Sequence, residues 1–87
     1  MNLVIKGKCT SSYEAVYKDF MELSESRAQC CDESKTVIGK IDNNNFVVLI
    51  FDVDMSKLKE ILSTPERAEV IKKNGISNEM FQFIPLE

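Results

Sequence analysis

Residues 45–53 place apolar side chains on both alternating faces of a predicted strand. Successive side chains of a strand point to opposite faces, so a strand covered on one side only should alternate apolar with polar residues. The two sets are Phe46, Val48 and Ile50 on one face, and Val47, Leu49, Phe51 and Val53 on the other. The pattern therefore predicts cover on both faces. Helices of the same chain would cover one face, and a second subunit would cover the other.

Three further segments have the pattern of strands: residues 2–8, 35–41 and 80–86. Residues 42–45 are an aspartate followed by three asparagines, which predicts a turn because these side chains bond to their own backbone. Pro85 confines the end of the last strand to a sheet edge or a strand terminus.

Two helical regions lie between these strands. Ser11 and Glu14 have the spacing of a capping box, and the helix after them should end between Ala28 and Cys31. Asp54 can cap the second helix, which should be broken and restarted at Pro65. Asn74 followed by Gly75 then predicts its end.

The resulting βαββαβ order predicts a ferredoxin-like α+β fold. Such a chain forms a four-stranded antiparallel sheet with both helices on one face, and the first and third strands are central. The third strand is the two-faced one, in the position that needs the most apolar strand. We expect residues 1–87 to form one domain.

Charge and composition remove several classes of function. A net charge of −3 argues against a surface for nucleic acid or anionic membrane, and no apolar run approaches the roughly 20 residues that cross a bilayer. Residues 1–8 lack the layout of a signal peptide, and three cysteines, an odd number, agree with a reducing compartment. We therefore expect a cytoplasmic protein that binds neither nucleic acid nor membrane.

The chain contains no histidine, which removes the commonest general base and the commonest zinc ligand. Adjacent Cys30 and Cys31 could bind a soft metal or sense oxidation. We favour instead a buried Cys31 with a more exposed Cys30. Cys9 lies one helix length away, so no intrachain disulfide is expected. The sequence thus predicts no metal and no cofactor.

Residues 55–76 are similar to a stretch that follows the third strand in the dimeric α+β barrel superfamily, the antibiotic-monooxygenase-like domains. That stretch reads helix, Ser-Pro-Glu, helix, Gly-Val/Ile, and here Ser63-Thr64-Pro65-Glu66 and Gly75-Ile76 match it. The resemblance implies a homodimer in which two sheets pack face to face into a barrel. Some members are oxygenases acting on polycyclic quinols, some degrade haem, others isomerise or dehydrate small molecules, and many have no assigned activity. Without histidine, haem degradation with a histidine iron ligand is not expected.

A candidate ligand site lies on the face of the first helix that should point at the sheet. Tyr13, Tyr17 and Ser24 would orient a ligand there, and Arg27 would meet an anionic or quinoid oxygen. Asp52, at the end of the third strand, would hold Arg27. The alternative is an ordinary amphipathic core in which Arg27 extends to solvent.

Two functions remain open. In the first, the homodimer binds or transforms a small, partly apolar molecule in a helix-sheet pocket without histidine or metal, with cofactor-independent oxygenation as the chemistry to test first. In the second, the chain is a non-catalytic regulatory or protein-interaction domain whose dimer is the functional unit. An apolar cavity of roughly 300 Å³ or more would favour the first. An interface filled by Tyr13, Tyr17 and Phe20 would favour the second.

Overall fold

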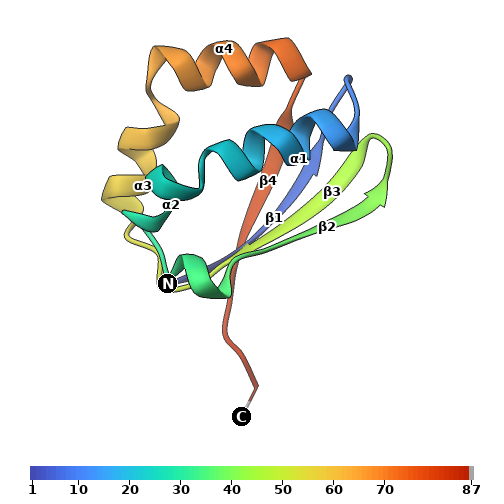
Figure 1. The fold of residues 1–87 in the computed structure, drawn as a ribbon. Helices are drawn as coiled ribbons and strands as arrows, with labels where there is room; N and C mark the ends of the chain where they lie inside the picture. Colours follow the sequence, from blue (N-terminus) through green and yellow to red (C-terminus); the bar gives the residue numbers. More distant parts are fainter. Residues whose placement is uncertain (87) are drawn as a thin grey trace.

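The computed structural model describes residues 1–86 and has the predicted ferredoxin-like architecture, with the helices on one face of a four-stranded antiparallel sheet (Figure 1). The elements are β1 Asn2–Lys8, α1 Tyr13–Glu22, α2 Ser24–Ala28, a short 3₁₀ helix η1 Glu33–Lys35, β2 Val37–Asp42, β3 Asn45–Ile50, α3 Met55–Leu62, α4 Pro65–Asn74 and β4 Ser77–Phe83. The strand order is β2-β3-β1-β4, so the first and third strands are central as predicted. Glu87, the last residue of the expected domain, lies outside the described residues.

The core lies between the sheet and the helices. The first predicted face of β3, which carries Phe46, Val48 and Ile50, is buried there together with Leu3 of β1. Gly7 pairs with Phe46 in the neighbouring strand, and a Cβ at residue 7 would lie 2.2 Å from the Phe46 ring. Glycine is therefore required at this point, because the ring packs directly on the backbone of β1.

The opposite face of the sheet carries an apolar row, and no helix within residues 1–86 covers it (Figure 1). Val37, Leu49, Val4 and Phe81 lie side by side across the four strands. We call these four residues the outer row. Its two ends, Val37 and Phe81, are 52% and 51% exposed, whereas the inner face of β3 is buried. The prediction that one face of β3 packs under the helices is confirmed.

Helix boundaries follow local capping, with two corrections. Ser12, not Ser11, caps α1, because the Ser12 side chain accepts a hydrogen bond from the backbone N–H of Ala15. The predicted long first helix is interrupted at Leu23, which separates α1 from α2. The predicted caps at Asp54 and Thr64 are confirmed.

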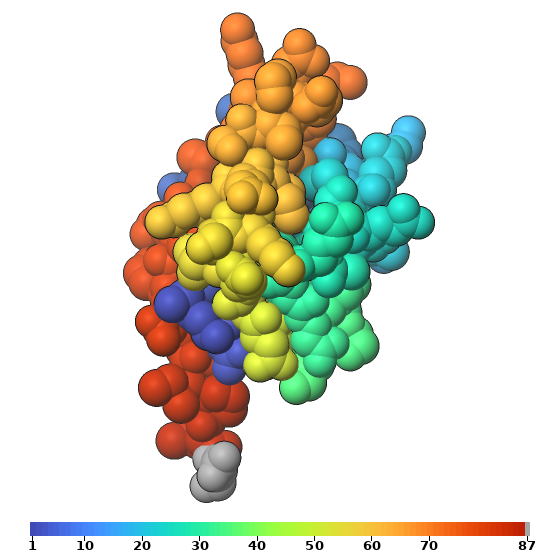
Figure 2. Space-filling view, turned by 90° about the vertical axis from the view of Figure 1, so that its left-hand side faces the viewer, coloured from blue at the N-terminus to red at the C-terminus, as the bar shows by residue number. Residues whose placement is uncertain are grey.

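Strand β4 begins and ends earlier than the sequence predicted. Gly75 adopts a left-handed conformation with φ of 59°, and the N–H of Ile76 bonds to the carbonyl of Ile71. This ending turns the chain at once into a strand over Ser77–Phe83, rather than one over 80–86. Residues 84–86 run past the end of the sheet, and Ile84 is 84% exposed there (Figures 1 and 2). The second strand is also displaced: β2 begins at Val37, since η1 occupies Glu33–Lys35.

Among residues 1–86, no helix is both long and apolar enough to cross a membrane.

Candidate functional site

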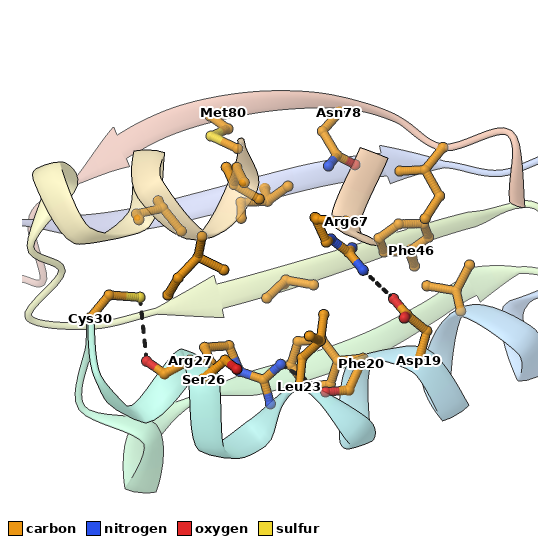
Figure 3. Close-up of a pocket in the computed structure, with 17 residues that line it drawn as sticks. Asp19, Phe20, Leu23, Ser26, Arg27, Cys30, Phe46, Arg67, Asn78 and Met80 are labelled. Atoms are coloured by element: carbon orange, nitrogen blue, oxygen red, sulfur yellow. Dashed lines mark hydrogen bonds and ion pairs between the residues drawn. The ribbon is translucent and has the colours of Figure 1, made fainter. Parts of the chain in front are cut away.

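An apolar cavity of about 110 Å³ lies between the helices and the inner face of the sheet (Figure 3). Its walls come from β1, β3 and β4 on one side and from α1 to α4 on the other. The apolar lining includes Ile5, Val16, Phe20, Phe46, Val48 and Leu58. Besides the thiol of Cys30, five of the lining residues have polar or charged side chains, which are Asp19, Ser26, Arg27, Arg67 and Asn78. An apolar volume with a few convergent polar groups is the usual form of a small-molecule site.

One side of the cavity is closed by an ion pair between two helices. Arg67 of α4 donates to Oδ2 of Asp19 of α1 at 2.5 Å, and both side chains are 15% exposed (Figure 3). A second hollow of about 310 Å³ lies on the outer side of this pair, also lined by Thr64 and Glu66. Both spaces share Asp19 and Arg67 in their linings, together with Leu23, Ser26 and Ile61. The ion pair therefore stands between an inner chamber and an outer groove; we call it the neck.

The seam between the helices is visible from outside the molecule. In the space-filling view, α3 and α4 (yellow to orange) lie beside the teal segment that holds α2 (Figure 2). The residues shared by the two hollows come from both sides of this seam. The two hollows therefore meet along the seam between α1–α2 and α3–α4.

Arg27 lines the cavity, and each of its three guanidinium nitrogens donates a hydrogen bond to a protein group. Its Nε and Nη2 donate to the two carboxylate oxygens of Glu33 at 2.7 and 2.6 Å, and its Nη1 donates to the carbonyl of Phe20 at 2.8 Å. The guanidinium also lies 3.6 Å from the centre of the Phe20 ring. The predicted partly buried position is confirmed, since the side chain is 11% exposed.

The predicted partner of Arg27 is wrong: the acid is Glu33, not Asp52. Strand β3 ends at Ile50, and Asp52 has a positive φ of 54° with a side chain that is 66% exposed. Asp52 instead lies 3.5 Å from Lys35. The 3₁₀ helix η1 turns Glu33 back beneath the end of α2, and this local turn was not recognised in the sequence.

Of the five predicted ligand residues, the structure brings only Arg27 to the cavity. Tyr13 and Tyr17 pack against each other with ring centres 6.0 Å apart, and Lys40 of β2 lies 5.8 Å from the Tyr13 ring. Tyr17 is 43% exposed. Ser24 and Asp52 are not among the lining residues. The face of α1 that meets the cavity is that of Val16, Phe20 and Asp19, rotated from the predicted tyrosine face.

No local pattern in the sequence marks the two residues of the neck as partners. An aspartate on an amphipathic helix is typical of a solvent-exposed face, and the partner of Asp19 lies 48 residues away in α4. Arg67 lies in the first turn of the helix that restarts at Pro65, where a basic residue is usually solvent-exposed. Only the packing of α4 across α1 brings the two together.

All three cysteines are buried thiols, and the expected exposure of Cys30 is wrong. Cys30 is 3% exposed and Cys31 9% exposed, and each Sγ lies 3.3 Å from the carbonyl oxygen of Arg27. Burial is the main cause that raises the pKa of Cys30 above its ordinary value, and the neighbouring Cys31 raises it further. The Cys30 thiol thus stays protonated at neutral pH and is a poor nucleophile. Within the described chain, no group of three or more Cys, Asp or Glu residues could hold a metal ion.

The comparison with known proteins shows the fold. No family model matches the chain, and no curated protein matches it. SnoaB, a cofactor-independent oxygenase from Streptomyces nogalater, is similar with a TM-score of 0.63 and 13% identity over 99% of this chain and 92% of SnoaB. A protein from Deinococcus radiodurans described as a candidate antibiotic biosynthesis monooxygenase is similar with a TM-score of 0.50 and 12% identity, over 98% of this chain and 93% of its own. The chain has their fold. This agrees with the resemblance seen in residues 55–76.

Proposed function

We propose that this chain binds a small, partly apolar molecule in the inner chamber, with the polar part of the molecule at the neck. The observation that carries the proposal is an apolar cavity that ends at the Asp19–Arg67 pair. Because the chain has no histidine, the polar contacts would come from carboxylate, guanidinium, hydroxyl and amide groups. Such contacts orient a ligand without a metal.

The size of the chamber limits the ligand. An engineered cavity of about 150 Å³ in another protein holds one benzene ring, so a chamber of about 110 Å³ suits no more than a single ring. The chamber alone is smaller than the roughly 300 Å³ expected of a ligand pocket, and the site reaches that range only together with the outer groove. A polycyclic molecule does not fit the chamber. We therefore propose only that the chain binds a small molecule, and we do not propose for it the oxygenase activity named for SnoaB.

A cavity-filling variant tests the site. Ile5→Phe adds a ring from the central strand into the chamber, while Ile5→Leu keeps the side-chain volume and serves as the matched control. Native mass spectrometry of freshly purified protein should show a retained small molecule, or bound toluene after its addition, for the wild type and Ile5→Leu. Ile5→Phe should lose it. Equal binding by both variants, or no binding by the wild type, would contradict the proposal.

A second candidate function rests on the outer row. We propose that Val4, Val37, Leu49 and Phe81 pack against the same residues of a second copy, so that the chain is a homodimer. Burying a large apolar side chain contributes roughly 1.5–3 kcal/mol, and such a row is presented by each copy. If the inner chamber stays empty in solution, this surface supports a non-catalytic regulatory or interaction domain whose dimer is the functional unit.

Two equally exposed apolar residues test the dimer. Phe81, in the outer row, is 51% exposed, and Met21, on α1, is 49% exposed. Phe81→Glu should shift the protein to the monomer in sedimentation at low micromolar concentration, because it places a charge in the proposed interface. Met21→Glu should leave the dimer intact. A wild type that sediments only as a monomer would remove the proposal.

A further inference from the structure

The charges around the inner chamber are compensated within the protein. Arg27 is held by Glu33, and Arg67 is held by Asp19, so each cation that reaches the cavity already has a carboxylate partner. The outer groove adds Glu66, for which the described residues provide no ion pair. A ligand entering the site therefore meets no uncompensated positive charge.

The neck still has hydrogen-bonding capacity. Among residues 1–86, the side-chain hydrogen bond of this pair joins only Nη1 of Arg67 to Oδ2 of Asp19. Oδ1 of Asp19 and the remaining guanidinium N–H groups of Arg67 have no partner in the described chain, and none of them is fully buried. The neck thus presents a free hydrogen-bond acceptor, Oδ1 of Asp19, beside free N–H donors of Arg67. A hydroxyl group complements this arrangement, since it donates to one and accepts from the other.

From this geometry we infer that the site selects uncharged ligands with one apolar ring and a hydroxyl group, and that the Asp19–Arg67 neck makes the selection. The inference rests on the proposed function, because it names the ligand class of the same chamber. A carboxylate would lie beside Asp19 and near Glu66, where like charges repel. An ammonium group would lie beside Arg67 and would lose its hydration in an apolar chamber. A hydroxyl group avoids both penalties.

Four single-ring probes of similar size test the selection: toluene, p-cresol, benzoate and benzylamine. Binding is measured by NMR titration of backbone amides in the wild type. We expect p-cresol to bind about tenfold or more tightly than toluene, because it adds a hydrogen bond to a charged group. Benzoate and benzylamine should bind more weakly than p-cresol. A p-cresol affinity no greater than that of toluene, or of either charged probe, would overturn the inference.

Variants that neutralise one charge of the neck should change which probe binds most tightly. Loss of structure would instead weaken the binding of all four probes. Asp19→Asn leaves Arg67 uncompensated, so benzoate should become the preferred probe. Arg67→Gln leaves Asp19 uncompensated, so benzylamine should become preferred. Glu14→Gln, on the exposed part of the same helix, is the control and should keep the wild-type order of probes. Unchanged preferences in both neck variants would contradict the assignment.

The outcomes separate the two proposals. If toluene and p-cresol bind equally, the chamber accepts ligands and only the role of the neck fails. If none of the four probes binds, the proposed function fails as well. Urea denaturation of each variant checks that it is folded at the temperature of the titration.

Discussion

Arg27 and Glu33 form a two-point ion pair that joins the end of α2 to the 3₁₀ helix η1, with both carboxylate oxygens engaged. Two parallel bonds between guanidinium and carboxylate fix the orientation of both groups, and this geometry is specific to arginine. Because a third guanidinium nitrogen donates to the carbonyl of Phe20, Arg27 also satisfies a backbone acceptor near the end of α1.

We predict that Arg27→Gln lowers the free energy of unfolding by about 2–3 kcal/mol. The substitution leaves the Glu33 carboxylate without its two guanidinium donors in a partly buried setting. It also removes one hydrogen bond to the carbonyl of Phe20 and the stacking on the Phe20 ring. Urea denaturation followed by circular dichroism measures the change.

Lys35→Gln is the matched control for this prediction. Lys35 also pairs with an acid, Asp52, but the two side chains are 57% and 66% exposed. Exposed pairs contribute little, so we expect a change below about 0.5 kcal/mol. If Arg27→Gln and Lys35→Gln lowered the free energy of unfolding equally, the burial of the Arg27–Glu33 pair would not contribute to stability.

The sequence predicted those features that depend only on residues close together in the chain. The alternation of Phe46, Val48 and Ile50 located the buried face of β3, and the caps at Asp54 and Thr64 placed the starts of α3 and α4. These features depend on side-chain period and on local hydrogen bonds. Local patterns therefore sufficed for the order of elements and for the sheet.

The candidate site could not be predicted in the same way. Within the unbroken helix α1, Val16 and Phe20 line the cavity, whereas Tyr13 lies near Lys40 of β2. The rotation of this helix against the sheet depends on tertiary packing, which a local pattern does not determine. The neck joins Asp19 to Arg67 across 48 positions, and nothing in either local sequence marks the partner. Arg27 was predicted because it lies near the face of the first helix that should point at the sheet, but its partner depends on the short turn of η1.

A second stability prediction concerns Gly75, whose backbone conformation favours glycine. Gly75 has φ of 59°, and a Cβ there would lie 2.0 Å from Oγ1 of Thr10. A left-handed conformation costs a residue with a Cβ about 1–2 kcal/mol, and the contact with Thr10 adds to this. We expect Gly75→Ala to destabilise the protein by about 2 kcal/mol or more in urea denaturation.

Gly39 provides the comparison, since its Cβ would meet only Val47 at 3.5 Å, an ordinary contact. Gly39→Ala should be neutral or slightly stabilising, because alanine loses less conformational entropy on folding. A Gly75→Ala variant as stable as Gly39→Ala would contradict the assigned role of Gly75.

The β2–β3 turn should depend on pH through Asp42. The side-chain amide of Asn45 and then the backbone N–H of Asn44 lower the pKa of Asp42 below its ordinary value of 3.8. A carboxyl with a lowered folded-state pKa stabilises the fold above pH 3.8, and the contribution is lost as pH falls through the folded pKa. Asp42→Asn should therefore be less stable than the wild type at neutral pH, with a difference that shrinks in acid.

Thermal melts at neutral pH and at about pH 2–3 measure this difference. Asn45→Ala removes the main donor while keeping the carboxylate, so NMR titration should show the pKa of Asp42 moving up toward its ordinary value. A wild-type advantage over Asp42→Asn that is constant with pH would show that the carboxylate charge is not responsible.

The buried thiols make the last prediction. Cys9, Cys30 and Cys31 are each less than a tenth exposed, and burial raises the pKa of Cys30. Alkylation requires an accessible thiolate, so native protein should react with N-ethylmaleimide much more slowly than free cysteine does. After unfolding without reductant, the mass should increase by three additions per chain, since Cys9 lies far along the chain from the other two and the three are thiols in the fold. Rapid modification of native Cys30, or a mass lower by two hydrogens with only one addition, would contradict the buried-thiol assignment.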